Sequence, residues 1–441
     1  MLADPARSEL SRTLSFFEWT TVLSCITIQL ASYVEGPLDV EALRAAWDLL
    51  RQSQPILTAR ITPQHPDSAD LASSLTFEIP DAPVGSQFRV QHAGYPTPEP
   101  LTVDDPVAIV EVAHAQDAGQ VARVSLIVHH AAGDGRLVLH WMRELWSHYT
   151  DLVEGKPPST QQFPVPASPE ELLSARGIAK TGMRGNRDSE LRNATPSVPG
   201  HADPGMEIRF GRVQLSESAT AMLRASAKAH GQTMHALVAG AAAVATRRFL
   251  PVSGEHALEL IVHSPVDIRA RVSPAIPVWG GTNALGVADA LVSVHPKSNA
   301  IVVGADVVRQ IQAGLDTGAV HRSFLDMPEF FGGPGPAKPL IVTTNLGAVD
   351  PFPVPEGITI IELRGSVTAN WPQFIAAMNA LGHQAHHPAL DGTTHIILTY
   401  AGRLSIDVIT TMAAPQVAAY TEALEEILLE LGEIRSTQDV G

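Results

Sequence analysis

The alternation of apolar and polar positions predicts a protein built of both helices and strands. Apolar residues repeat at helical spacing over Leu38–Leu50, and Asp39 is placed to cap the first turn. Val121–Val128 is largely apolar and rich in strand-forming residues, which predicts a strand buried on both faces. Beyond Gly135, apolar residues return at helical spacing as far as Leu152. The chain is therefore expected to form a strand, a tight turn and a helix here.

The same patterns continue through the rest of the chain. Two successive helices are predicted over 216–230 and 233–249, and a last helix over 415–431. The helix over 233–249 is rich in alanine and glycine, so we expect it to be buried with its backbone close to a neighbour. Strands are predicted over 56–61, 261–266, 340–344, 359–363, 395–400 and 404–409.

The length of the chain, 441 residues, exceeds what one ordinary hydrophobic core holds. Between about residues 178 and 206 glycine, asparagine, serine, proline and charged residues dominate, and apolar periodicity is lost. We therefore expect an N-terminal lobe over 1–180 that carries the strand, turn and helix described above, a linker over 181–206 and a C-terminal lobe over 207–441. Both lobes are expected to be α/β.

Composition and charge indicate a folded protein and argue against some classes of partner and location. A hydrophobic fraction of 45% with 17% charged residues is ordinary for a folded chain, and the single cysteine, Cys25, cannot form an internal disulfide. A net charge of −16 without a basic run argues against binding of nucleic acid. Residues 1–15 lack the apolar core of a signal peptide, and Thr20–Val34 is too short and too polar to span a bilayer. We expect a cytoplasmic protein with no membrane span.

Candidate chemistry lies in the segment His129-His130-Ala131-Ala132-Gly133-Asp134-Gly135, between the predicted strand and helix. In α/β proteins functional side chains gather at such strand ends. An imidazole, with an unperturbed pKa of about 6.5, suits removal of a proton from an acceptor hydroxyl or amine at neutral pH. A thioester donor is already activated, so no serine or cysteine nucleophile is needed. Asp134 is close enough to orient a histidine and is also placed to make a buried ion pair, while Gly135 permits a backbone conformation that a β-carbon would hinder.

His129-His130-x-x-x-Asp134-Gly135 matches the HHxxxDG motif of the chloramphenicol-acetyltransferase-like superfamily, which also includes nonribosomal-peptide condensation domains and plant BAHD acyltransferases. The chain most resembles its mycobacterial polyketide-associated, phthiocerol dimycocerosyl transferase-like acyltransferases. The resemblance covers nearly the whole chain and is specific at the histidine motif. Its other parts are the opening stretch to Ile56-Leu57, Ser264–Arg269, Gly281-Thr282-Asn283, Thr343–Gly347 and Tyr400–Leu404.

The resemblance implies roles for individual residues. His130 would be the general base, and His129 a structural or helper residue. Asp134 would point away from the substrate and pair with an arginine from the second half of the chain, for which Arg269 is the candidate. Gly135 would serve the turn, and Asn345 would lie near the substrate path.

The resemblance also implies a fold and partners. Two chloramphenicol-acetyltransferase-like lobes would meet in a V, with a central tunnel that donor and acceptor enter from opposite faces. The donor would be a thioester of coenzyme A or of the phosphopantetheine arm of an acyl carrier protein. The acceptor would be a small-molecule alcohol or amine of polyketide, lipid or secondary-metabolite biosynthesis. No metal or other cofactor is required, and we expect a monomer.

Other interpretations stay open at this stage. The same motif would serve a stand-alone condensation or cyclisation enzyme that forms an amide, or a non-catalytic scaffold that binds a carrier protein. An anionic donor needs a local basic patch, for which Arg247, Arg248, Arg309 and Arg322 are the candidates. We do not interpret the cluster His383, His386, His387 and His395 as a metal site, because two adjacent histidines point apart and Pro388 and Gly392 indicate a loop.

Overall fold

The computed structural model describes residues 11–63, 75–80, 87–92, 94–114, 121–158, 161–181, 207–250, 256–327, 339–380 and 392–433. The chain divides into two compact units. Unit 1 consists of Met1–Ile178, Ile268–Leu285 and Pro351–Ala377, and unit 2 of Ala179–Asp267, Gly286–Asp350 and Met378–Gly441.

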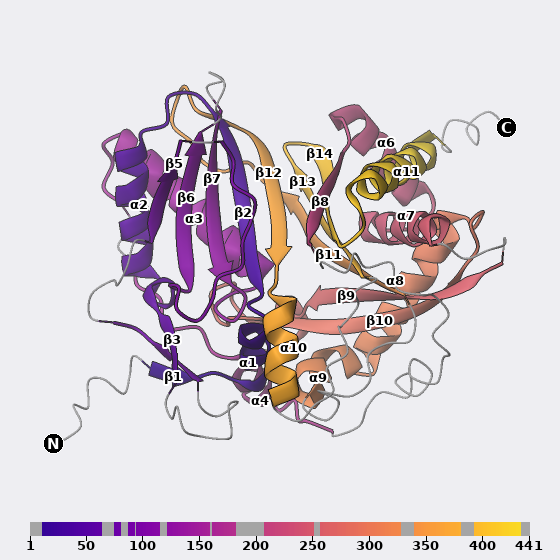
Figure 1. Cartoon of the computed structure of the whole chain (residues 1–441), viewed down its shortest axis with the longest axis horizontal. Coiled ribbons are helices and arrows are strands. Elements are labelled where there is room, and N and C mark those ends of the chain that lie inside the picture. The colour runs from indigo at the N-terminus through magenta and orange to yellow at the C-terminus, as the bar shows by residue number, and fades with distance from the viewer. Residues whose placement is uncertain are drawn as a thin grey trace. The chain divides into compact units, whose positions relative to one another are not determined.

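Unit 1 is built on a five-stranded sheet in the order β12-β2-β7-β6-β5 (Figure 1). Its strands are β2 (Thr27–Glu35), β5 (Phe88–Gln91), β6 (Ala108–His114), β7 (Val121–His129) and β12 (Thr359–Thr368). All neighbours are antiparallel except β5 and β6. A smaller sheet joins β1 (Ser11–Thr13), β4 (Leu75–Glu78) and β3 (Arg60–Pro63). The shorter helical elements of the unit are α1 (Phe16–Leu23), η2 (Pro55–Thr58), α4 (Pro169–Ser174), η4 (Arg269–Arg271) and the start of α10 (Trp371–Ala380).

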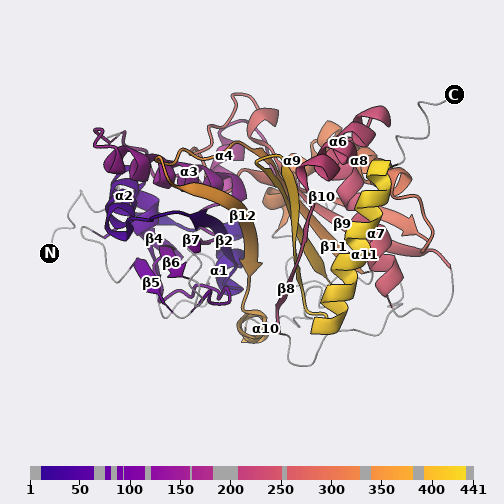
Figure 2. The ribbon, with the colours of Figure 1, turned by 90° about the horizontal axis from the view of Figure 1, so that it is seen from above.

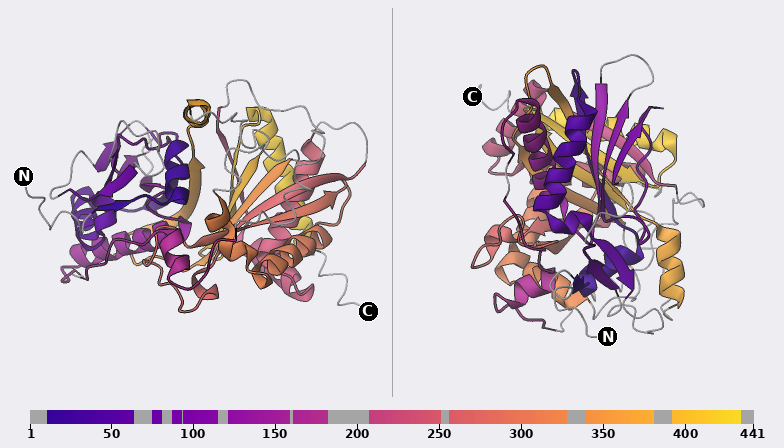
Figure 3. Two further views of the ribbon diagram at one scale, coloured as in Figure 1. Left: turned by 90° about the horizontal axis from the view of Figure 1, so that it is seen from below. Right: turned by 90° about the vertical axis from the view of Figure 1, so that its left-hand side faces the viewer.

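Two helices, α2 (Val40–Ser53) and α3 (Gly135–Val153), cover one face of this sheet (Figures 2 and 3). Trp146 of α3 is fully buried, and its indole nitrogen donates to Ser32 of β2 at 3.1 Å. Ser32 pairs with Val124 of β7, so the even-numbered residues of β7 face α3. His129, an odd-numbered residue, consequently lies on the opposite face.

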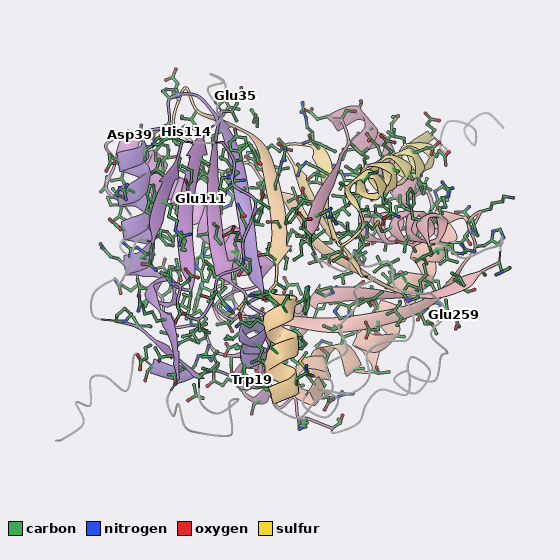
Figure 4. The ribbon with its side chains drawn as sticks, in the orientation of Figure 1. Trp19, Glu35, Asp39, Glu111, His114 and Glu259 are labelled. Carbon is green, nitrogen blue, oxygen red and sulfur yellow. The ribbon has the colours of Figure 1, made fainter. Side chains whose placement is uncertain are left out.

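That opposite face carries polar side chains. Gln29 donates to Ser125 at 2.8 Å, and the guanidinium of Arg123 pairs with Glu111 at 2.9 Å. Figure 4 shows Glu111 on β6, within the sheet. Because these buried polar groups are paired across neighbouring strands, they fix the register of the strand that ends at the histidine motif.

Unit 2 is built on a six-stranded sheet in the order β10-β9-β11-β13-β14-β8. Its strands are β8 (Arg209–Gln214), β9 (Leu258–Asp267), β10 (Leu285–Val294), β11 (Leu340–Val349), β13 (Thr393–Tyr400) and β14 (Arg403–Thr410). The helices α6 (Glu217–Ala229), α7 (Met234–Phe249), α8 (Ala300–Asp316) and α11 (Ala414–Glu433) lie on one side of it (Figure 2), and α9 (Ala319–Asp326) follows α8.

Helices α7 and α8 approach each other through glycine. A β-carbon on Gly240 would lie 2.0 Å from the carbonyl oxygen of Ala300, and one on Gly304 would lie 1.9 Å from that of Ala236. The alanine- and glycine-rich α7 is buried over most of its length. The predicted close approach of this helix to a neighbour is therefore confirmed.

The α/β class and most predicted elements are confirmed. The predicted helices correspond to α2, α3, α6, α7 and α11, and Asp39, Ser216 and Thr233 cap three of them. The strand predicted over 56–61 is wrong, because Pro55–Thr58 forms a 3₁₀ helix and the strand is confined to Arg60–Pro63. Proline suits the first turn of a helix, since its missing N–H would have no partner there.

The division into contiguous lobes differs from the observed units. Residues 268–285 and 351–377 follow the predicted linker, yet they belong to unit 1. The first of these segments holds the histidine motif, and the second contains β12, which pairs with β2. The linker itself lies, beyond Thr181, outside the described residues. The V-shaped arrangement and the tunnel stay predictions.

In the part of the chain that the structure describes, no helix has the length and apolar character needed to cross a bilayer.

Candidate active site

The histidine motif begins where β7 ends. The His129 N–H donates to Val107 at 2.8 Å, and the His130 N–H donates to Ile26 at 2.8 Å. The turn then closes when Ala132 donates to the His129 carbonyl at 2.8 Å. Because these hydrogen bonds to neighbouring chain segments hold the backbone of His129 and His130, the positions of the two imidazoles are fixed.

Asp134 starts the helix that follows. It is the N-cap of α3, and its Oδ1 accepts from the N–H groups of Arg136 at 3.1 Å and Leu137 at 3.0 Å. A carboxylate at this position satisfies two of the free N–H groups of the first turn and faces the positive end of the helix. The carboxylate therefore joins the motif rigidly to α3.

The predicted ion pair between Asp134 and Arg269 is present. Nη2 of Arg269 lies 3.1 Å from Oδ1 and 2.9 Å from Oδ2 of Asp134. The aspartate is fully buried and the arginine is 7% exposed. Oδ2 also accepts from the N–H of Ala284 at 2.9 Å. With both oxygens engaged inside the protein, Asp134 cannot also receive a proton from His130 through a direct contact, and it acts as the anchor of the turn.

His129 is held as a neutral ring. It is 1% exposed, and burial lowers its pKa to about 3, with a smaller contribution from His130 in the same direction. Nδ1 accepts from the N–H of Ala131 at 3.2 Å, so the ring proton is on Nε2. Nε2 is buried and has no hydrogen-bond partner within the described residues.

His130 is also held neutral. Burial lowers its pKa below the ordinary value of histidine, against the opposite effects of its own backbone carbonyl, Asp134 and the Asn283 side chain. Its Nδ1 is buried, while the residue as a whole is only partly buried. Phe17 of α1 contacts the ring edge to face at a centroid distance of 6.4 Å. A neutral imidazole is suited to accept a proton.

The glycine that the turn requires is not Gly135, as expected from the sequence. Gly135 begins α3, and its φ lies outside the left-handed region, so it has no conformation that a β-carbon would hinder. At Gly133, by contrast, a β-carbon would lie 2.8 Å from the ring of Trp141. The glycine that packing requires is thus Gly133.

The remaining sequence candidates belong to unit 2 or lie outside the described residues. Asn345 is on β11 in unit 2, where it is exposed and its Oδ1 accepts from the Gly347 N–H at 2.8 Å across a β-bulge. His395 is buried on β13 and bonds Tyr420 at 2.7 Å, whereas His383, His386 and His387 lie outside the described residues. Among the residues that are described, no three metal-ligating side chains gather.

The four arginines proposed as a basic patch are all engaged within the protein. Arg247 donates to the His256 carbonyl at 2.6 Å, and Arg248 donates to that of Pro296 at 3.2 Å. Arg309 pairs with Asp306, and Arg322 donates to the Thr317 carbonyl at 3.3 Å.

Sequence reasoning missed several residues that surround the motif. Phe17, Thr282 and Asn283 contact it or hold it in place, and although all three stood in stretches that the resemblance had marked, none was singled out. Their residue types alone carry no signal of this function, because threonine and asparagine are common in loops of any kind.

Part of the chain matches a known family model. Residues 204–409 match the family model described as the C-terminus of phthiocerol/phthiodiolone dimycocerosyl transferase. The phthiocerol/phthiodiolone dimycocerosyl transferase of Mycobacterium tuberculosis is 27% identical over 367 residues, which cover 81% of this chain and 85% of that protein.

Solved structures share the fold. Polyketide synthase associated protein 5 of Mycobacterium tuberculosis matches with a TM-score of 0.75 at 24% identity, over 96% of this chain and 97% of that one. The first condensation domain of the calcium-dependent antibiotic synthetase matches with a TM-score of 0.65 at 15% identity, over 96% and 97% of the two chains. The resemblance predicted from the sequence is confirmed.

Proposed function

We propose that the chain is an acyltransferase of the chloramphenicol-acetyltransferase-like superfamily, with His130 as the general base, and its similarity to the relatives named above supports this. The transferases named among its relatives support acyl transfer to a lipid hydroxyl. The observation that carries the proposal is the state of His130: a neutral, partly buried imidazole directly after the end of β7, with Nδ1 buried, so that Nε2 is the atom we expect to meet a substrate.

The chemistry needs one base. Nε2 of His130 removes the proton of the acceptor hydroxyl as the oxygen attacks the thioester carbonyl. The tetrahedral intermediate then collapses, the carbon–sulfur bond breaks, and the imidazolium returns the proton to the leaving thiolate. The low pKa of His130 favours release of that proton, because burial disfavours the charged ring. Asp134 takes no proton in this scheme and holds the turn.

The substrates follow from this chemistry. The donor is a thioester of coenzyme A or of a phosphopantetheine-bearing carrier protein, and the acceptor is a small-molecule alcohol of lipid or secondary-metabolite biosynthesis. The proposed reaction uses no metal or other cofactor. We place it in the cytoplasm and expect a monomeric enzyme. Formation of an amide from an amine acceptor is the alternative that the shared motif leaves open.

The experiment measures thiol release from a panel of acyl-coenzyme A donors and from an acyl-loaded carrier protein. The one cysteine of the chain, Cys25, is buried, so a thiol reagent meets little background from the protein. Mass analysis of the products with alcohol and amine acceptors then separates an ester from an amide. Release of thiol with ester formation is the expected result. Absence of release from every donor of both classes would overturn the proposal.

A further inference from the structure

An aromatic side chain from another element lies against the proposed base. Phe17 of α1 meets the His130 imidazole edge to face, with the ring centroids 6.4 Å apart and the ring planes at 81° to each other. Phe17 is 8% exposed, so nearly all of its surface is covered by the protein. A group that approaches the imidazole from the side of α1 therefore meets a phenyl ring.

The position of Phe17 is fixed through its backbone. Its N–H donates to Oε1 of Glu170 on α4 at 3.1 Å, and its carbonyl accepts from the Thr20 hydroxyl at 2.7 Å. A capping box opens α1, in which the side chains of Ser15 and Glu18 each accept from the backbone N–H of the other. Because these bonds hold the first turn of α1, the ring cannot leave the motif by a shift of the backbone.

The same turn is tied to the segment that holds the histidine motif. Glu18 is fully buried, and its carboxylate accepts from the Thr282 hydroxyl at 2.5 Å. The Thr282 carbonyl in turn accepts from the Asp134 N–H at 2.8 Å. Phe17 and His130 thus belong to one hydrogen-bonded framework, so the fold sets the space beside the two rings.

A phenyl ring at this place has a steric consequence for acyl transfer. The ring has no hydrogen-bonding group and no charge, so it acts on a substrate through its volume and its apolar surface. The acceptor oxygen gives its proton to the imidazole while it bonds to the thioester carbonyl, so the carbon next to that carbonyl passes close to the pair of rings. In an apolar pocket, one methylene more or less changes kcat/KM by roughly 10–200-fold.

We propose that Phe17 is a specificity-determining residue: its ring is the wall beside the His130 imidazole and favours acyl groups that are apolar and unbranched next to the carbonyl. The inference rests on the proposed role of His130 as the base. The donor class is then a straight-chain acyl thioester, in preference to one with a methyl branch beside the carbonyl. A smaller side chain at position 17 relaxes this preference.

The test is the acylation of His130 in the full chain by two reagents of different bulk, diethyl pyrocarbonate and di-tert-butyl dicarbonate. Both react with an unprotonated imidazole, and mass spectrometry of peptides gives the rate at each histidine. The exposed His92 is the internal reference for the reactivity of each reagent. In Phe17→Leu the rate at His130 with the bulky reagent, relative to the small one, should rise by about 10-fold.

Phe16→Leu is the matched control. Phe16 precedes Phe17 on the same helix, is half-buried, and packs its ring on Trp19 at a centroid distance of 5.4 Å. Consecutive residues of an α-helix project about 100° apart, so this change removes the same atoms on a different side of α1. The ratio of the two rates at His130 should therefore stay at the wild-type value.

An unchanged ratio in Phe17→Leu, or an equal change in Phe16→Leu, would overturn the inference. Circular dichroism and Tm establish that each variant is folded, and Phe17→Met, whose flexible side chain fills irregular space, replaces Phe17→Leu should that variant not fold. The acylation needs no substrate, so a chain that releases no thiol would remove the proposed function and leave this result standing.

Where thiol release is found, the same variant is measured with an α-methyl-branched acyl-coenzyme A donor and its straight-chain isomer. Phe17→Leu should raise kcat/KM for the branched donor, relative to the straight one, by about 10-fold. A preference identical to that of the wild-type protein would also overturn the inference.

Discussion

Removal of the Asp134 carboxylate should destabilise unit 1 far more than removal of an ordinary helix cap. Asp134→Ala leaves the guanidinium of Arg269 buried without its counter-charge, since that side chain is 7% exposed and its partner is fully buried. Breaking a buried pair on one side costs about 3–5 kcal/mol. Loss of the two bonds to the first turn of α3 adds about 1 kcal/mol. For a folded unit of this size, each kcal/mol lowers Tm by roughly 2–4 °C.

The chain supplies a matched control for the capping part of this cost. Asp39, at the start of α2 (Figure 4), caps this helix through two backbone bonds of 3.0 Å each, but it is exposed and pairs with no arginine within the described residues. Asp39→Ala should therefore cost only about 1 kcal/mol. The difference between the two variants isolates the buried charge.

The assay is urea unfolding followed by circular dichroism, on the two alanine variants, Asp134→Asn, Arg269→Met and the double variant Asp134→Asn/Arg269→Met. The double variant should be more stable than the sum of its single changes predicts, because neither charge is then left alone. Equal costs for Asp134→Ala and Asp39→Ala, or strictly additive costs in the cycle, would refute the anchoring role. A stable but inactive Asp134→Ala would instead assign the carboxylate a part in the reaction.

Two further outcomes are expected in unit 2. Gly240→Ala should lower Tm by several degrees, because its β-carbon would meet the Ala300 carbonyl oxygen at 2.0 Å. The control is Gly155→Ala, whose β-carbon meets no atom within 4 Å, so that it tests only the positive φ of 70°. Equal losses of Tm in the two variants would contradict the close packing of α7 and α8. His395 has a pKa of about 4 in the folded chain, so its contribution to stability is complete above about pH 6.5 and is lost as the pH falls toward 4, at a cost of about 3 kcal/mol. The unfolding free energy of His395→Gln should accordingly fall less steeply over that pH range, and a parallel pH dependence in both proteins would show that the ring is not held neutral.

The sequence could predict what depends on local pattern. The spacing of apolar residues located α2, α3, α6, α7 and α11, because one buried face is enough to define a helix. Asp39 could also be assigned as a cap from the sequence, because the N–H groups from which its side chain accepts are two and three residues away. The fixed spacing within the motif likewise marked His130 and Asp134.

What the sequence could not predict depends on partners far along the chain. The strand at Thr359 was expected, but nothing in its residues shows that it pairs with β2 in unit 1, because strand pairing is decided by tertiary register. Asn283 donates a hydrogen bond to the carbonyl of His130, 153 positions away, so this contact appears only in the folded chain. The pairing of Asp134 with Arg269 could be inferred only through the resemblance, as no local rule joins residues 135 apart.

The central claim is that the His130 imidazole is the base, and the rate of thiol release by His130→Ala tests it most directly. His92→Ala is the control, since His92 is an exposed histidine near the end of β5, away from the motif. With a donor that the wild-type protein uses, His130→Ala should be slower by about 10²–10⁴-fold while its circular dichroism spectrum and Tm match the wild type, and His92→Ala should keep the full rate. A folded His130→Ala that releases thiol at the wild-type rate would contradict the account.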